Sequence, residues 1–183
     1  MSRNYKIRNQ DKLYFVTFTV IQWLDVFIRR ECRDLLLDSI RYCQKNKGLE
    51  VWAHCAMTSH AHWIMGRHGE PSLEGIIRVI KKYTSTKIIE AIAANDHESR
   101  RELLLWLFER AGKRNSNNTK YQFWQQHNQP IELNSNKKLD QRLNYIHQNP
   151  VEAGIVLSPE DYIYSSAMNY AGRPEILLDV MLL

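Results

Sequence analysis

Residues 49–65 read Leu-Glu-Val-Trp-Ala-His-Cys-Ala-Met-Thr-Ser-His-Ala-His-Trp-Ile-Met, and this stretch decides the predicted fold. Two runs rich in strand-forming side chains, 49–57 and 60–65, are separated only by Thr58-Ser59. A two-residue connection between such runs is typical of a tight β-hairpin. The sequence therefore predicts two neighbouring antiparallel strands, the second of which begins with a His60-Ala61-His62 motif.

The residues around this hairpin predict a strand and two helices. Residues 13–20 alternate as a strand does, with one face formed by Val16, Phe18 and Val20 and the other by Phe15, Thr17 and Thr19. Residues 30–46 repeat apolar side chains at intervals of three and four, and Gly48 follows as a helix-ending glycine. Pro71-Ser72 begins a second helix that continues through Ile88. The order so far is strand, helix, strand, strand, helix.

The rest of the chain is expected to complete a single domain over 1–183. Residues 95–120 form a polar insertion with a short apolar helix at 103–108, and 157–183 form a C-terminal extension. Residues 121–133 suit an edge or final strand, interrupted by the polar stretch 125–129. Asn134-Ser135-Asn136 then caps a helix that runs through Ile146. This order predicts an α+β sandwich, an antiparallel sheet with helices on one face.

Composition narrows the class of protein. The 183 residues, 44% hydrophobic and 25% charged, suit one globular core. Residues 1–142 hold 24 basic and 15 acidic side chains, a net +9, whereas 143–183 hold one and five, a net −4. A basic body favours, weakly, a polyanionic partner such as nucleic acid. Three cysteines without C-x-x-C spacing indicate reduced thiols, and no signal sequence or bilayer-spanning run is present, so we expect a cytoplasmic protein.

The His60-Ala61-His62 motif is the first candidate site. Side chains two apart on a strand point to the same side, so both imidazoles could bind one divalent ion at about 2.1 Å. Two ligands would leave positions open for water or phosphate oxygens. The alternative is an incidental pair of surface or core histidines, and spacing alone leaves both interpretations open.

Tyr145 and Asn149 form the second candidate site. They are four residues apart and share one face of the expected helix, whereas Leu139, Leu143 and Ile146 can face the core. In the alternative interpretation, Asn149 only ends the helix before Pro150 and Tyr145 is a half-buried core tyrosine.

These motifs, in this order, resemble the single-tyrosine HUH transposases, and most closely the REP-associated tyrosine transposases. The resemblance covers nearly the whole chain and rests on residues 49–64, 73–84, 123–125, 145–156 and 161–167. Its most specific part is Tyr-Ile-His-Gln-Asn-Pro-Val-Glu-Ala-Gly-Ile-Val at 145–156. One departure is Thr58-Ser59, where the family usually has Pro-Asn before the first histidine; this changes the hairpin but not the ligands.

The resemblance implies a ferredoxin-like sheet with an added C-terminal catalytic helix. It implies metal-dependent cleavage and rejoining of single-stranded DNA at hairpin-associated sites, through a 5′-phosphotyrosine intermediate. Tyr145 would be the nucleophile, and His60, His62 and Asn149 would bind Mg²⁺ or Mn²⁺. The partner would be single-stranded DNA with hairpin elements, and the protein a monomer or homodimer. Because protonated imidazole cannot bind a metal, we expect activity to fall as the pH drops through about 6.5.

We expect basic side chains and one aromatic ring to bind the DNA: Arg78, Lys81, Lys82, Lys87, Lys113, Arg114, Lys120 and Trp124. Each basic residue could equally be solvated surface, and aromatic residues at such spacings are more often core. Trp52 is expected in the core, and His54 and His147 are not expected to be ligands.

Two other functions are compatible with the sequence. One is a catalytically silent protein that binds hairpin DNA; the presence of His60, His62, Tyr145 and Asn149 together speaks against it, because binding alone does not require all four. The other is an unrelated metal hydrolase of small phosphoesters, whose activity would survive Tyr145→Phe.

Overall fold

A four-stranded antiparallel sheet forms the centre of the computed structural model, which describes residues 7–116, 120–126, 128–173 and 177–183. The strand order is β2-β3-β1-β4, formed by β1 (Tyr14–Thr19), β2 (Leu49–Ala56), β3 (His60–Arg67) and β4 (Ile131–Glu132). One helix connects β1 to β2, and another follows β3. This is the β-α-β-β-α-β order of a ferredoxin-like fold, so the predicted α+β class is confirmed.

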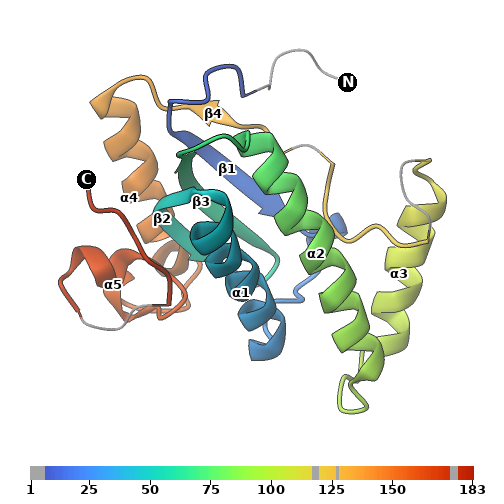
Figure 1. Ribbon diagram of the computed structural model, residues 1–183. Helices are drawn as coiled ribbons and strands as arrows, with labels where there is room; N and C mark the ends of the chain where they lie inside the picture. The colour runs from blue at the N-terminus through green and yellow to red at the C-terminus, as the bar shows by residue number, and fades with distance from the viewer. Residues whose placement is uncertain (1–6, 117–119, 127, 174–176) are drawn as a thin grey trace.

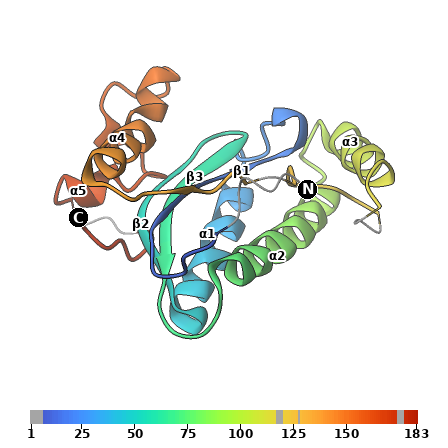
Figure 2. The same ribbon diagram turned by 90° about the horizontal axis from the view of Figure 1, so that it is seen from above.

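Two helices, α1 (Arg30–Lys47) and α2 (Leu73–Ala94), cover one face of the sheet (Figures 1 and 2). Gly48 ends α1 with a φ of +68°, and a Cβ there would collide with the carbonyl of His68. The hydroxyl of Ser72 caps α2 by accepting a hydrogen bond from the Gly75 amide at 3.2 Å. Both helix ends therefore follow from the residues that predicted them.

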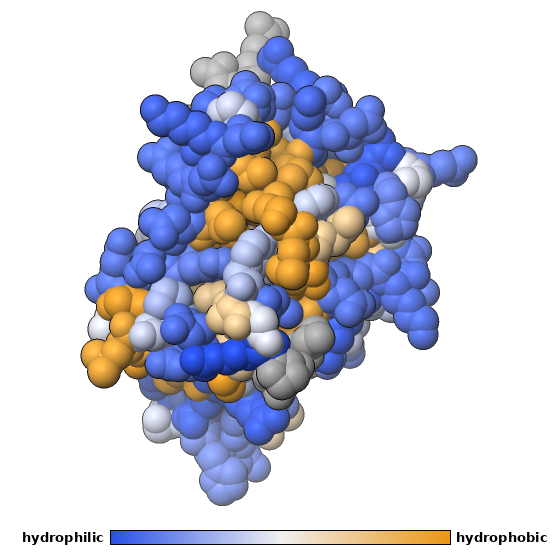
Figure 3. Space-filling model, turned by 90° about the vertical axis from the view of Figure 1, so that its left-hand side faces the viewer, coloured by the Kyte–Doolittle hydropathy of each residue, from blue (hydrophilic) through white to orange (hydrophobic). Residues whose placement is uncertain are grey.

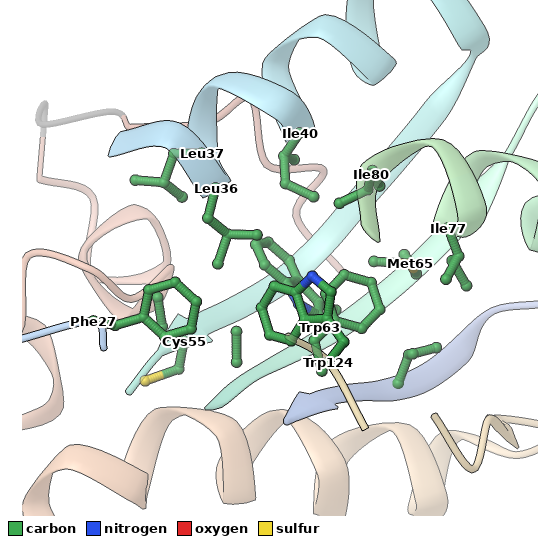
Figure 4. Packing of buried hydrophobic residues seen from close by; sticks show 14 of the residues in the cluster. Phe27, Leu36, Leu37, Ile40, Cys55, Trp63, Met65, Ile77, Ile80 and Trp124 are labelled. Carbon is green, nitrogen blue, oxygen red and sulfur yellow. The ribbon is translucent and has the colours of Figure 1, made fainter. Parts of the chain in front are cut away.

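The main hydrophobic core lies between this helical layer and the sheet (Figure 4). Trp63 and Met65 of β3 are fully buried beneath Leu36 and Ile80 from the two helices. Phe18 of β1 is also fully buried. The alternation predicted for 13–20 explains this packing, because every second side chain of β1 enters the same layer.

A third long helix, α4 (Asn136–Glu152), lies on the opposite face of the sheet (Figure 2). Ser135 caps it, as the sequence predicted, by accepting a hydrogen bond from the Lys138 amide at 3.4 Å. The sequence pattern did not predict which face α4 covers. It packs against β2 and β3, so Tyr145, the predicted nucleophile, lies over the sheet.

The segment after α4, which includes α5 (Ala167–Tyr170), attaches the C-terminal part of the chain to β2. The hydroxyl of Tyr162 donates to the carbonyl of Ala56 at 2.7 Å, and that of Tyr170 donates to the carbonyl of Trp52 at 2.8 Å. Further along, the amide of Met181 donates to the carbonyl of Val51 at 2.9 Å. The segment thus covers part of the edge of β2.

Figure 3 shows a patch of apolar side chains, bordered by polar ones, on the side of the molecule where Figure 1 places the C-terminus. Met181, Leu182 and Leu183 of the C-terminal segment are exposed. Within the described residues, no helix combines the length and apolar composition needed to cross a bilayer.

The edge strand predicted over 121–133, with its interruption at 125–129, is confirmed at its two ends. Only β4 pairs, with Tyr14 and Phe15 of β1, and Trp124 forms a single bridge to Val20. The carbonyl of Gln125 instead accepts a hydrogen bond from the Lys81 ammonium at 2.7 Å, which draws this part of the chain towards α2.

The helix predicted at 103–108 is longer, α3 (Arg101–Lys113). Gly112 allows it to pack closely against the carbonyl of Lys120, where a Cβ would collide. Residues 117–119 of the proposed insertion lie outside the described residues.

Candidate active site

His60 and His62 lie on the face of β3 that α4 covers, with ring centroids 4.8 Å apart. Thr17 stands opposite His62 on β1, and its Oγ1 is 2.9 Å from Nδ1 of the imidazole. The Oγ of Ser59 lies 3.2 Å from Nδ1 of His60. A hydroxyl therefore holds the Nδ1 side of each ring, so the arrangement leaves Nε2 as the nitrogen for a metal.

Both imidazoles are held in their neutral form. Burial, with smaller contributions from His60 and Arg142, lowers the pKa of His62 to about 3. Burial also lowers the pKa of His60, against a smaller opposing effect of Asp25. Neutral imidazole is the form that binds metals. The expected acid loss of activity therefore moves below pH 6.5, because both pKa values lie below that of a free histidine.

Nε2 of His62 is buried and has no hydrogen-bond partner among the described residues. An orphaned buried nitrogen costs free energy, and a metal ion would compensate for it. The two imidazoles therefore fit a divalent ion. Nowhere in the described ranges do three or more His, Cys, Asp or Glu side chains gather closely enough to hold a metal, so amide, water or phosphate oxygens would have to complete the coordination.

Tyr145 reaches this histidine pair from α4. Its ring centroid is 5.1 Å from that of His62 and 5.9 Å from that of Phe15, and both contacts are edge-to-face. Its side chain is 39% exposed, so the phenol is accessible from solvent. The structure thus brings together three of the four residues predicted for the site.

Asn149 lies one turn after Tyr145, on the predicted face of α4. Its Nδ2 donates to the carbonyl of Tyr145 at 3.0 Å, in an exposed position. This bond uses the amide nitrogen and leaves Oδ1 available as a ligand atom. No direct contact between Asn149 and the histidines is observed, so its role as a third metal ligand stays a prediction.

Arg142 is a site residue that the sequence interpretation missed. Its guanidinium lies 4.8 Å from the ring centroid of Phe15 and 5.8 Å from that of Tyr145. A spacing of three residues before Tyr145 on the same helix was the available signal. Together, the two neutral imidazoles could bind a metal ion and the guanidinium a phosphate, next to a phenol that could act as the nucleophile.

The structure corrects the role predicted for Trp124. Its side chain is only 5% exposed, and its Nε1 donates to Oγ1 of Thr84 at 3.0 Å. The ring packs against Phe18, Phe27 and Phe123 in the core, so it is not available to stack on a base.

Lys81 is partly buried beside Trp124. Its ammonium donates to the carbonyl of Gln125 at 2.7 Å and to Oδ1 of Asn128 at 2.6 Å, and burial lowers its pKa to about 7. It lines a groove of about 510 Å³ between α2 and residues 121–126 and 128, together with the exposed Arg78 and Lys82. Arg78 and Lys82 make the groove basic, whereas the lowered pKa of Lys81 leaves it only partly charged at neutral pH. Lys81, however, also has a structural role, because it holds Gln125 and Asn128 against α2.

The remaining predicted DNA contacts are all on the surface and lie outside the histidine site. Lys87 pairs with Glu90 at 2.7 Å, and Lys113 pairs with Glu109 at 2.8 Å. The Lys120 ammonium lies 4.8 Å from the ring centroid of Tyr121, and Arg114 is exposed. Lys113 and Arg114 are at the end of α3, which both ribbon views place on the far side of the molecule from α4 (Figures 1 and 2).

His54 and His147 are placed away from the candidate metal ligands. His54 is buried and stacked on Trp63, with ring centroids 5.8 Å apart, and burial lowers its pKa to about 3. Nε2 of His147 lies 2.9 Å from Oγ of Ser166, and burial lowers its pKa to about 4. Ser166 also contacts the backbone of His54, so these residues join α4 to β2.

Comparison with known proteins gives a fold neighbour. No protein-family model matches the sequence, and no curated protein matches it either. The structure is similar to that of a REP-associated tyrosine transposase bound to a REP hairpin, with a TM-score of 0.65 and 17% sequence identity. The likeness covers 99% of this chain and 94% of the other. The chain therefore has the fold of a REP-associated tyrosine transposase, as its motifs predicted.

Proposed function

We propose that this protein cleaves and rejoins single-stranded DNA near hairpins, as a metal-dependent tyrosine transposase does. The observation that carries the proposal is the position of Tyr145. Its ring lies 5.1 Å from that of His62, whose Nε2 is buried without a partner. A nucleophile beside a pair of candidate metal ligands is an arrangement suited to attack on a phosphodiester.

His60 and His62, with Asn149, are the residues that would hold the metal, Mg²⁺ or Mn²⁺. When bound, the ion would offset the negative charge of the scissile phosphate and orient it. Arg142 supplies a further positive charge beside the Tyr145 ring. A guanidinium of this kind binds phosphate oxygens and favours the approach of an anionic substrate to the phenol.

In the proposed step, Tyr145 Oη attacks the phosphorus in line with the bond to the 3′ oxygen. A bond forms between Oη and phosphorus while the bond to the 3′ oxygen breaks. The phenol loses its proton to solvent, and the 3′ oxygen takes up a proton. The products are a 5′-phosphotyrosine and a free 3′-hydroxyl. Because one phosphoester replaces another, a second 3′-hydroxyl can reverse the step without ATP.

The proposed partner is hairpin DNA with a single-stranded flank. Two observations support it: the fold neighbour was solved with a REP hairpin, and the α2 groove carries the exposed cations Arg78 and Lys82. Lys and Arg side chains neutralise phosphates without reading their sequence, so this groove would position the DNA.

A denaturing gel tests the proposal. Labelled hairpins from the DNA that flanks the gene are incubated with Mn²⁺ or Mg²⁺ and with wild-type or Tyr145→Phe protein. Tyr83→Phe is the matched control, because Tyr83 is also an exposed helical tyrosine, 45% exposed, but lies on α2. We expect a protein–DNA adduct that survives denaturation with wild-type and Tyr83→Phe protein and is absent with Tyr145→Phe.

Two results would overturn it. Hairpin binding without an adduct or cleavage in either metal would favour the silent DNA-binding protein. Hydrolysis of a small phosphoester such as p-nitrophenyl phosphate that survives Tyr145→Phe would favour the unrelated metal hydrolase.

A further inference from the structure

Trp23 is an exposed tryptophan at the edge of the candidate active site. Its side chain is 58% exposed, and its ring contacts the imidazole of His60 edge-on, with centroids 5.2 Å apart. Trp63 and Trp124 are buried, and the other exposed tryptophan, Trp106, lies on α3 beneath the guanidinium of Arg110. An exposed indole beside a predicted metal ligand calls for a physical explanation, because exposure of so large a ring sacrifices hydrophobic burial.

The backbone at this ring is strained. Gln22 and Trp23 have φ values of +53° and +55°, in the left-handed region that residues other than glycine rarely adopt. Two consecutive residues of this kind cost free energy, and such conformations persist where the surrounding structure holds them in place. They also concentrate at binding and catalytic sites, where the strain positions a functional group.

Three backbone hydrogen bonds hold the 20–27 loop in this conformation. The amide of Val20 donates to the carbonyl of Ser59 at 3.0 Å, and the amide of Phe27 donates to that of Thr58 at 2.8 Å. The amide of Ile21 donates to the carbonyl of Phe123 at 2.9 Å. The loop is therefore fixed to the hairpin turn that leads into His60, so Trp23 and His60 are positioned as one unit.

A nucleotide base is the ligand whose chemistry fits this ring. Unpaired bases present a flat π face, and stacking on an exposed aromatic ring is tolerant of base identity. The phosphate next to such a base would lie near the imidazoles. A ring held rigidly by the backbone would also lose little conformational entropy when a base stacks on it.

We propose that Trp23 stacks on an unpaired base of the single strand next to the scissile phosphate. This inference rests on the proposed function for the location of that phosphate. The stacking itself requires neither the nucleophile nor a metal ion.

The test measures binding alone. In a Tyr145→Phe background and in the presence of EDTA, a short fluorescein-labelled oligothymidylate is titrated and its anisotropy is followed. We expect Trp23→Ala to weaken binding by about 5- to 150-fold, the range for loss of a base–aromatic stack. Trp23→Phe should recover most of the affinity, because phenylalanine also stacks. Trp106→Ala, which removes the other exposed indole, should stay within about twofold.

Quenching of tryptophan fluorescence by unlabelled oligothymidylate gives a second readout. We expect quenching with the Trp106→Phe protein and its loss with Trp23→Phe. Thermal melting by circular dichroism confirms that each variant is folded. If Trp23 only supports the His60 ring, Trp23→Ala will leave oligonucleotide affinity in EDTA unchanged, and the proposal is wrong.

Lack of binding by the protein that retains Trp23, or quenching that persists in Trp23→Phe, would also overturn it. The two proposals fail separately. Trp23-dependent binding without an adduct from wild-type protein contradicts only the proposed function, whereas an adduct with normal binding by Trp23→Ala contradicts only the stacking role.

Discussion

The two faces of the sheet are made by the same strands but are built differently. Towards α1 and α2, β3 presents Trp63, which is fully buried in an apolar layer (Figure 4). Phe18 of β1 is also fully buried. Towards α4, the neighbouring positions of the same strands present His62 and Thr17, which are joined by a hydrogen bond. Tyr145 covers this second face only in part and is 39% exposed.

Because alternate side chains of a strand point to opposite faces, one strand can stabilise the fold with one face and contribute to the candidate site with the other. On β3, His60 and His62 belong to the candidate site, whereas Ala61 and Trp63 between and after them are buried in the core. We call the buried face towards α1 and α2 the closed face and the partly exposed face towards α4 the open face. Variants of the closed face should lose stability, whereas variants of the open face should lose activity and remain folded.

The largest expected effect is on the open face and comes from metal removal. Treatment with EDTA should abolish the covalent adduct completely, because the phosphate would lose the ion that offsets its charge. The denaturing gel measures the adduct, and circular dichroism in EDTA should show that the protein remains folded. Readdition of Mn²⁺ should restore the adduct. An adduct that forms in EDTA would contradict the prediction.

On the closed face, Trp63→Ala should lower the free energy of unfolding by about 3–5 kcal/mol, because it leaves a large cavity in the core. Urea denaturation followed by circular dichroism measures the change. Trp106→Ala is the control, since this exposed ring should contribute within about 0.5 kcal/mol. An equal loss in both variants would show that Trp63 packing is not what stabilises this face.

Local periodicity paired the residues of the predicted site, and the family resemblance assigned their roles. The period of a strand placed His60 and His62 together, and the period of a helix placed Tyr145 and Asn149 on one face. The exposure of Trp23 and the burial of Trp124 could not be predicted, because both depend on how distant segments pack. The strand predicted at 121–133 pairs only at its ends for the same reason, since Lys81 of α2 bonds the carbonyl of Gln125.

Acid should destabilise the protein through its buried histidines, which include His54 beside Trp63 and His62 on the face towards α4. The pKa of His54 and that of His62 are both about 3 in the folded protein, below the ordinary value of 6.5. The unfolded chain therefore binds more protons below pH 6.5, so the free energy of unfolding is greatest above that pH. It should fall as the pH is lowered from 6.5 towards 4, by about 1.4 kcal/mol per pH unit for each histidine.

Urea titrations across this pH range measure the slope. His54→Gln should reduce it by the share of one histidine, whereas the exposed His97→Gln should leave it unchanged. A slope of zero in the wild-type protein would contradict the role of burial.

The smallest expected effect sharpens the description of the open face. Thr17→Val removes the hydroxyl that lies 2.9 Å from Nδ1 of His62. Loss of such a supporting bond should raise the Mn²⁺ concentration needed for half-maximal adduct by about tenfold. Thr86→Val, on the exposed side of α2, serves as the control and should not change it. An unchanged Mn²⁺ requirement in Thr17→Val would mean that the strand alone orients His62.

The hydrogen bonds that join the C-terminal segment to β2 can form only late in the synthesis of the chain. Tyr162 follows its partner Ala56 by 106 residues, and Ser166 follows His54 by 112. At about 5–20 residues per second, the ribosome needs roughly 5–20 s to synthesise the chain between them. During that interval the two histidines of β3 already exist, but the residues that fasten the tyrosine-bearing helix do not. A nascent chain therefore cannot hold a completed site until these late residues have been made.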